Sequence, residues 1–185
     1  MHTAVVKLKS VSPYSQGKVI RTPREERETA ADHEERTWRE RMHVTEHGFV
    51  QIPQMAFKNC ISEAAKFLGI QIPGKGKSTY TKHFESGVLV LEPLVLKTKA
   101  VDVQGEWLFV PSDGKRGGGS RVWKCFPVIP QWAGEVTFNI LDDAITKKVF
   151  TQHLEEAGKF IGLGRFRPRN NGFYGRFSVE DVAWE

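Results

Sequence analysis

The chain has 185 residues, a formal net charge of +5 and an isoelectric point near 9.2. Its 39% hydrophobic and 11% aromatic residues can fill a core, which excludes a globally disordered protein. The longest apolar run, residues 88–96, contains Glu92 and Pro93, so we expect no membrane span. The basic balance favours an anionic partner such as nucleic acid. This length predicts a single domain over residues 1–185.

The two cysteines, Cys60 and Cys125, both lie in apolar patterns. Two cysteines do not make a disulfide framework, so we predict that both are reduced and buried. The first residues lack the apolar stretch of a signal peptide. These two observations predict a cytoplasmic protein.

The first fifty residues predict a strand followed by a charged insertion. Residues 3–11 alternate between apolar and polar types, as a half-buried strand does. Residues 24–47 are rich in charges at helical spacing, which fits a thin amphipathic helix or a mobile flap that orders on binding. We expect an insertion over about 20–48 that stands out from the core and packs through Trp38.

A short strand over 49–53 leads into the clearest helix of the sequence, residues 54–68. Its apolar residues recur at helical spacing and form one core-facing stripe. Gly69 follows as the C-terminal cap.

A second insertion, about 71–86, invites comparison with a nucleotide-binding P-loop because Lys75 completes a Gly-x4-Gly-Lys spacing. Gly76 stands where that motif needs Ser or Thr, and the segment follows a helix instead of a strand. We therefore reject the P-loop. A flexible basic loop remains, with Tyr80 and Phe84, suited to tracking a nucleic-acid backbone.

The second half predicts four strands, a helix and a last strand, with a flexible glycine-rich tip between the second and third strands. The strands are expected at 87–97, 100–111, 121–130 and 134–141, the tip at 112–120, the helix at 144–157 with Gly158 as its cap, and the last strand at 172–179.

Residues 158–177 are the most unusual segment. They hold five glycines, five basic residues, five aromatic residues and no acid. Glycine lets the backbone turn sharply near a ligand, arginine grips phosphate oxygens, and aromatic rings stack on bases. We predict a loop that holds a polyanion, while the alternative is a loop of solvated arginines with its aromatic residues in the core. Phe173 and Phe177 are expected to enter the core, which leaves Tyr174 as the stacking candidate. The predicted nucleic-acid contacts are Lys75, Lys77, Lys115, Arg116, Gly162, Gly164, Arg165, Arg167, Arg169, Tyr174 and Arg176.

Without the insertions, the order of elements is strand, helix, two or more strands, helix, strand. This order predicts an α+β protein with a ferredoxin-like, RRM-like antiparallel sheet and two helices on one face. The insertions are expected at about 20–48, 71–86 and 112–120. The other face of such a sheet is open, and single-stranded nucleic acid often lies there or along its loops.

The chain resembles the RAMP superfamily, whose ferredoxin-like members form the backbone and processing subunits of CRISPR effector complexes. Residues 50–69 are similar to the family's Ile-Pro start of the first helix, and residues 161–179 to its glycine-rich loop after the second helix. Residues 10–18 fit the family's opening strand and loop. The chain is shorter than most backbone subunits of the family. Its own short insertions would therefore have to take the place of the family's long thumb insertions.

The resemblance implies a non-catalytic protein that binds single-stranded RNA along the glycine-rich loop, and that assembles with other CRISPR-type subunits or with copies of itself. Two alternatives remain open: a single-stranded DNA-binding or annealing protein, and a phage or mobile-element protein that mimics or inhibits an effector complex. We expect no enzyme, cofactor or metal, because the histidines are scattered and no catalytic spacing is present. Some family members cut RNA with one loop aspartate, and Asp32 is the residue here that would be compared with it.

Overall fold

The computed structural model describes residues 1–115, 117 and 119–185, and nine strands lie within them. The strands are β1 (His2–Ser10), β2 (Tyr14–Ser15), β3 (Phe49–Ile52), β4 (Val88–Leu89), β5 (Leu94–Lys99), β6 (Gln104–Pro111), β7 (Arg121–Ile129), β8 (Ala133–Ile140) and β9 (Phe177–Trp184). The α-helices are α1 (Ala30–Thr37), α2 (Gln54–Leu68), α3 (Thr81–Gly87) and α4 (Lys147–Glu156). Shorter helical turns are η1 (Trp38–Arg41), η2 (Ala100–Asp102), the π-helical η3 (Ala157–Ile161) and η4 (Pro168–Asn170).

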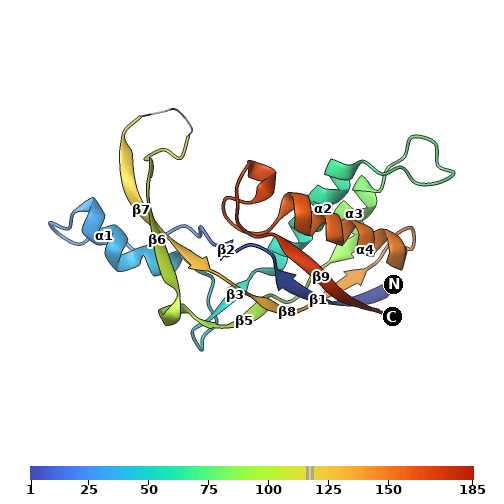
Figure 1. Ribbon diagram of the computed structural model, residues 1–185, viewed down its shortest axis with the longest axis horizontal. Helices are drawn as coiled ribbons and strands as arrows, with labels where there is room; N and C mark the ends of the chain where they lie inside the picture. Colours follow the sequence, from blue (N-terminus) through green and yellow to red (C-terminus); the bar gives the residue numbers. More distant parts are fainter. Residues whose placement is uncertain (116, 118) are drawn as a thin grey trace.

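The central sheet has the strand order β4-β8-β1-β9, and every neighbouring pair in it is antiparallel. Helix α2 follows β1 in the chain and α4 follows β8, and the two helices pack together over one face of the sheet (Figure 1). The core order is therefore strand, helix, two strands, helix, strand. The α+β, ferredoxin-like arrangement predicted from the sequence is confirmed.

The core lies between this sheet and the two helices. Val6 of β1 is opposite Val136 of β8, and both are buried. The predicted stripe of α2 faces them, with Phe57, Ile61 and Ala64 all buried. Burial of these apolar side chains is the main force that stabilises this part of the molecule.

The opposite face of the sheet is open but does not look like a base-stacking surface. Lys7 of β1 lies between Glu135 of β8 and Asp181 of β9, so opposite charges meet across the strands. The exposed positions of these fully described strands hold small, aliphatic, polar or charged side chains, not aromatic ones. Single strands bind best where cations and aromatic rings gather. This face is therefore less suited to binding single-stranded nucleic acid than we expected from the sequence.

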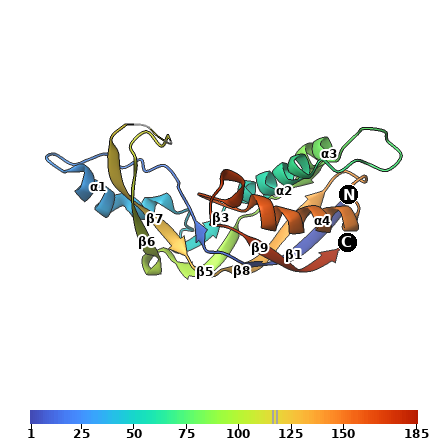
Figure 2. The ribbon, with the colours of Figure 1, turned by 45° about the horizontal axis from the view of Figure 1, so that its top comes forward.

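A second lobe consists of the β6–β7 hairpin with α1 and η1 beside it (Figures 1 and 2). Trp38 is buried there, as predicted for the charged insertion. A polar network stabilises the contact: Arg41 donates to both carboxylate oxygens of Glu34, at 2.7 and 2.9 Å. Arg41 also donates to the Cys125 carbonyl at 3.0 Å, and the Cys125 N–H donates to Glu34 at 2.9 Å. The insertion is thus fixed to β7 by a buried ion pair.

Two expected helix features are wrong in detail. Helix α4 begins at Lys147 with Thr146 as its N-cap, and it continues through a π-helical turn instead of ending at Gly158. Gly158 is buried inside that turn, where a Cβ would lie 2.2 Å from the Phe177 carbonyl oxygen. The helix ends instead at Gly162, whose φ of 72° favours glycine.

The last strand and the second insertion also differ from expectation. β9 begins at Phe177, so residues 172–176 stay in the loop and Asp181 lies within the strand. In the insertion, residues 81–87 form α3, and both Tyr80 and Phe84 are buried. They are core residues and not part of a nucleic-acid track.

The strand expected at 87–97 is two strands separated at Pro93, because β4 joins the central sheet and β5 pairs with β3. The strand expected at 100–111 starts at Gln104, after η2.

Cys60 and Cys125 are both free and buried, which confirms their predicted burial. Burial raises the pKa of Cys60 to about 12 and that of Cys125 to about 11. Separately, none of the helices in the described residues is both long and apolar enough to cross a membrane.

Candidate nucleic-acid interface

The glycine-rich loop, residues 162–176, emerges from the end of η3 and lies between the helices and the hairpin (Figure 1). Gly164 has a φ of 75° and Gly175 a φ of 82°, conformations that other residues adopt at a cost. A Cβ on Gly175 would lie 1.9 Å from the Leu163 carbonyl oxygen. The Leu163 N–H donates to Gly175 at 3.0 Å, and the Arg165 N–H donates to Ser15 at 2.8 Å. The glycines thus let the loop close on itself and attach to β2.

Arg165 is the central cation of the loop. Its guanidinium lies 3.8 Å from the centre of the Phe126 ring on β7 and 5.4 Å from that of Tyr174. Nε donates to the Ser15 hydroxyl at 3.2 Å, whereas Nη2 is buried and has no hydrogen-bond partner among the described residues. The nearest carboxylate oxygen, of Glu106, is 3.8 Å away. Burial lowers the pKa of Arg165, and an unpaired donor in such a place favours an incoming acceptor.

The side chain of Tyr174 is held in place, because its hydroxyl donates a short hydrogen bond to Glu106 on β6. It is therefore not a freely mobile ring for base stacking. Burial and this hydrogen bond raise the pKa of Tyr174 to about 12. Phe177 is buried as predicted. Phe173 was expected in the core, but its side chain is 57% exposed, so that expectation is wrong.

Arg167 and Arg169 have a partner that the sequence did not indicate. Both contact Glu63 on α2, at 2.8 Å for Arg167 and 3.2 Å for Arg169. Arg176 donates from Nε to the Lys159 carbonyl at 3.2 Å. The loop is therefore less positive than its composition implies, and its arginines differ in how available they are.

A groove of about 590 Å³ separates the glycine-rich loop from the hairpin; we call it the loop–hairpin groove. Leu108, Val110 and Phe126 line the hairpin side, and Phe166 and Phe173 line the loop side. Cations stand among these apolar walls. They are Lys115, Lys124 and Arg165.

A smaller hollow of about 370 Å³ lies on the other side of Arg165, between β2 and the start of α2; we call it the α2-end hollow. Lys18, His43 and Gly164 line it with the first turn of α2. That helix begins without a side-chain cap, so its N–H groups add positive potential. Burial and the nearby Lys18 lower the pKa of His43. Arg165 thus lines both hollows.

The predicted contacts do not all meet. Lys115 joins the loop at the groove, but Lys75 and Lys77 lie in the α2–α3 connection, which Figures 1 and 2 both place at the end of the molecule away from the hairpin. Arg116 lies outside the described residues. The predicted contacts did not include Lys124 or Lys18, although Lys124 belongs to the basic cluster of residues 115–124.

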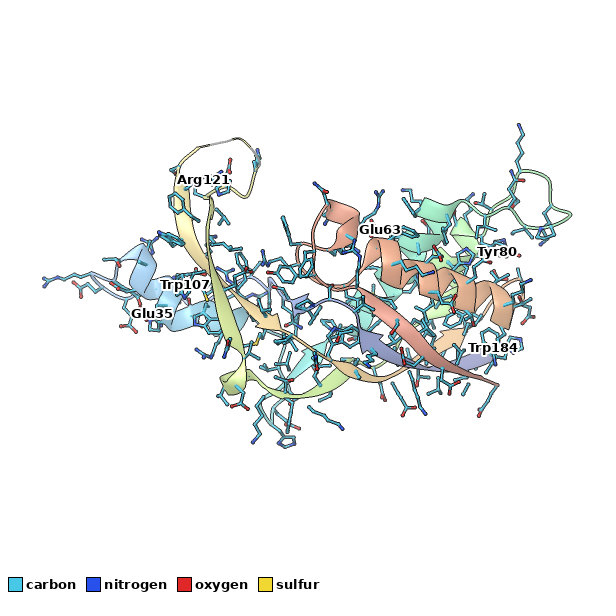
Figure 3. The ribbon with its side chains drawn as sticks, viewed as in Figure 1. Glu35, Glu63, Tyr80, Trp107, Arg121 and Trp184 are labelled. Atoms are coloured by element: carbon cyan, nitrogen blue, oxygen red, sulfur yellow. The ribbon has the colours of Figure 1, made fainter. Side chains whose placement is uncertain are left out.

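The hairpin carries three large exposed aromatic side chains, Trp107, Phe109 and Trp123. Trp107 and Trp123 do not line the loop–hairpin groove, whereas Phe109 does, and the ring centres of Phe109 and Trp123 are 5.3 Å apart. Figure 3 shows Trp107 on the α1 side of the hairpin, with Glu63 beyond the glycine-rich loop on the other side. The hairpin therefore exposes aromatic side chains both along the groove and outside it.

The polar groups with catalytic potential have structural partners. His83 contacts Asp142 at 2.6 Å, and Asp142 also accepts from the Ala144 N–H at 2.9 Å. Burial opposes ionisation of Asp142, but these hydrogen bonds hold its pKa below the usual value. Asp32 accepts from the Thr29 hydroxyl at 2.6 Å at the start of α1. Residues 1–115, 117 and 119–185 contain no group of three potential metal ligands.

With this geometry in view, the chain was compared with known proteins. No family model and no curated protein matches the sequence. Among solved structures, the chain is similar to Cmr6 from Pyrococcus furiosus, with a TM-score of 0.50, 13% identity, and coverage of 97% of this chain and 99% of that one. It is also similar to a chain of a CRISPR RNA-guided surveillance complex, with a TM-score of 0.39, 9% identity, and coverage of 96% of this chain and 67% of that one. The first comparison shows that the chain shares its fold with that protein.

Proposed function

We propose that this protein is a non-catalytic subunit of a CRISPR-type assembly that binds single-stranded RNA in the loop–hairpin groove. The strand passes along the glycine-rich loop, and neighbouring subunits or further copies of the chain continue its path. The fold shared with Cmr6 supports the assembly. The observation that carries the binding site is Arg165, a largely buried cation that lines two hollows and has a donor without a hydrogen-bond partner among the described residues.

A phosphate oxygen in either hollow would approach the Arg165 guanidinium, whose Nη2 lies 3.8 Å from the nearest carboxylate oxygen of the described residues. A hydrogen bond between two charged groups is stronger than a neutral one, and burial strengthens it further. The Phe126 ring holds the guanidinium in place, so little side-chain entropy remains to be lost on binding. Arg165 is therefore prepared for a phosphate.

The walls of the groove suit the rest of a nucleotide. Phe166 and Phe173 are 49% and 57% exposed, so their rings are available to stack on bases. Lys115 and Lys124 stand across from them on the hairpin and can neutralise further phosphates. An apolar wall beside lysines is the combination that single-strand binding uses, and it supports the groove over the open face of the sheet.

The absence of catalysis is part of the proposal. His83 is engaged by Asp142, and His153 is buried with its Nδ1 on the Val149 carbonyl at 2.7 Å. Asp32 accepts from the Thr29 hydroxyl, and its backbone N–H donates back to that hydroxyl at the start of α1. None of the three lines the loop–hairpin groove, which supports binding over cleavage.

A second candidate is a protein that docks onto an effector complex to mimic or inhibit it. The exposed Trp107, Phe109 and Trp123 favour this function, because large exposed aromatic residues are typical of protein interfaces. The alternative of single-stranded DNA binding uses the same groove, and the experiment below separates it from RNA binding.

Fluorescence anisotropy should be measured with RNA and DNA strands of one sequence and with the RNA duplex, at several salt concentrations. We expect the RNA strand to bind most tightly, with affinity falling steeply as salt rises. Arg165→Ala should weaken binding by about tenfold or more, since a charge-assisted hydrogen bond contributes about 1.5–3 kcal/mol. Arg24→Ala, a change in the exposed loop before α1, is the matched control and should bind as the parent does.

Circular dichroism checks that the Arg165 variant folds. A folded variant that binds RNA as tightly as the parent would contradict the site. Tighter binding of DNA would favour the annealing alternative. A parent that binds neither strand would favour the docking protein, which titration into a purified effector complex then tests.

A further inference from the structure

A separate hollow of about 640 Å³ lies where β1 ends, β5 runs past it and the β7–β8 turn closes the side. Figure 1 shows β5 and β8 running beside each other below the helices at this place. Lys9 of β1 lines the hollow and alternates with the buried Leu8, so it points away from the helices and toward the open face. None of the residues of the loop–hairpin groove lines this hollow. We name it the Lys9–Lys97 hollow.

β5 contributes to the hollow because it departs from regular pairing. Phe49 of β3 pairs with Lys99 and Gln51 pairs with Val95, so three residues of β5 lie opposite the single residue between Phe49 and Gln51. All three of these residues, 96–98, line the hollow. Irregularities of this kind re-aim side chains and are frequent near binding sites.

The electrostatics of the hollow differ from those of the neighbouring sheet. Lys7, two residues earlier, lies between Glu135 and Asp181, whereas Lys9 lies between Ala133 and Ser178. The lining contains no acid, and neither of its lysines takes part in an ion pair within the described part of the chain.

Glu180 is an acid close by on β9. It is occupied by a hydrogen bond from the Ser178 hydroxyl at 2.6 Å and does not line the hollow. Two unpaired cations in an acid-free concavity favour an anion.

The remaining lining adds donors and apolar surface. Trp132 is 5% exposed, and its indole N–H is buried without a hydrogen-bond partner among the described residues. Thr98 and Gln131 provide a hydroxyl and an amide, and Val11 lies at the hollow although its side chain is 65% exposed. A buried donor without an acceptor is uncommon in folded proteins. The hollow is much larger than a phosphate and falls in the size range of small-ligand sites, roughly 300–1,000 Å³.

We propose that the Lys9–Lys97 hollow binds a nucleotide, with the phosphate at Lys9 and Lys97 and the ribose and base against the apolar lining. The amide of Gln131 and the hydroxyl of Thr98 are suited to polar atoms on a base edge. An acidic peptide would use the lysines but not these groups, so the nucleotide fits better. The nucleotide can be free or one unit of a strand. This site is independent of the function proposed for the loop–hairpin groove.

The test uses isothermal titration calorimetry of the full chain with adenosine 5′-monophosphate, adenosine, inorganic phosphate and a hexaglutamate peptide. The variant is Lys9→Ala with Lys97→Ala. The matched control is Lys7→Ala with Lys99→Ala, which removes two lysines from the same strands but outside the hollow. All four lysines are exposed, and thermal melting confirms that both variants fold.

We expect the monophosphate to bind the parent more tightly than adenosine or phosphate alone. The Lys9/Lys97 variant should lose about tenfold or more in affinity, while the control stays within about twofold of the parent. Equal binding by the Lys9/Lys97 variant, absence of binding to the parent, or equal affinity for inorganic phosphate overturns the proposal. So does binding of the peptide in preference to the nucleotide.

A 12-nucleotide adenosine strand then distinguishes a free nucleotide from one unit of a strand as the natural ligand. The strand is added to the Arg165→Ala protein, in which the glycine-rich loop contributes less to strand binding. If the strand competes with the monophosphate, and if this competition depends on Lys9 and Lys97, the natural ligand is a nucleotide within a strand. Monophosphate binding that the strand leaves unchanged identifies a free nucleotide. Either result keeps the site, whatever the outcome at the loop–hairpin groove.

Discussion

The two lobes that form the loop–hairpin groove are stabilised in different ways. The sheet lobe is held by an apolar core in which residues such as Val6 and Phe138 are fully buried. The hairpin lobe depends on a buried ion pair, Glu34 with Arg41, and on its hydrogen bonds to Cys125. An apolar core tolerates small adjustments, whereas a buried ion pair fails when one partner is removed. The position of the hairpin should therefore be the more fragile half of the site.

Arg41→Ala tests this difference with the largest expected effect. It leaves the Glu34 carboxylate buried without its cation, and such a loss costs about 3–5 kcal/mol. We expect the amides of α1 and β7 to exchange hydrogen rapidly while those of β1 and β8 stay protected. Arg24→Ala is the control and should change neither. Equal loss of protection in both lobes would show that they unfold as one unit.

Gly175→Ala tests the closure of the loop on the sheet lobe. The residue has a φ of 82°, and a new Cβ would lie 1.9 Å from the Leu163 carbonyl oxygen. We expect a loss of about 1–3 kcal/mol and weaker RNA binding, because the loop can no longer place Arg165. Gly74→Ala, also at positive φ but with nothing near its Cβ, is the control for strain alone. Thermal melting and anisotropy measure the two effects, and a Gly175 variant no worse than the control would contradict the account.

Acid should weaken the sheet lobe through His153. This side chain is buried against Phe84, with ring centres 4.4 Å apart, and burial lowers its pKa below the usual 6.5. The unfolded chain therefore binds a proton that the folded chain does not, so stability falls as pH drops below about 6.5. Melting temperatures at pH 7.5, 6.5 and 5.5 measure the slope. His153→Phe should make it shallower, and an unchanged slope would assign the effect to other groups.

Glu63→Gln should have the smallest effect, and its sign is informative. Glu63 pairs with Arg167 and Arg169, which are partly exposed, so these pairs are worth little to stability. The change frees both arginines for phosphate, and we expect RNA affinity to rise about two- to fivefold with a steeper salt dependence. Glu85→Gln, on α3, is the matched control. A fall in affinity would mean that Glu63 positions the arginines for binding.

Local sequence patterns correctly predicted the elements that pack around the core of the sheet lobe. The stripe of α2, its cap at Gly69 and the alternation of β8 are all visible in the sequence because each depends on neighbours a few residues away. The last strand was misplaced because Phe173 and Tyr174 resemble strand residues, although the loop closes only at Gly175. The same local reasoning located the glycine-rich loop and its cations.

Contacts between distant residues could not be predicted. Glu63 meets Arg167, Glu34 meets Cys125, and Glu106 meets Tyr174 only after the chain has folded. Glu63 and Glu106 lie near the arginines of the loop, so composition alone overstated the positive charge of the loop. Lys75 and Lys77 show the same limit, because their loop lies at the other end of the molecule.

Crosslinking of single-stranded RNA carrying 4-thiouridine, followed by mass spectrometry, tests the binding site most directly. The account predicts crosslinks to Phe166 and Phe173 on the loop and to Phe126 on the hairpin, with fewer in the Arg165→Ala protein. Crosslinks concentrated on the open face of the central sheet, around Val5 and Thr137, would contradict it.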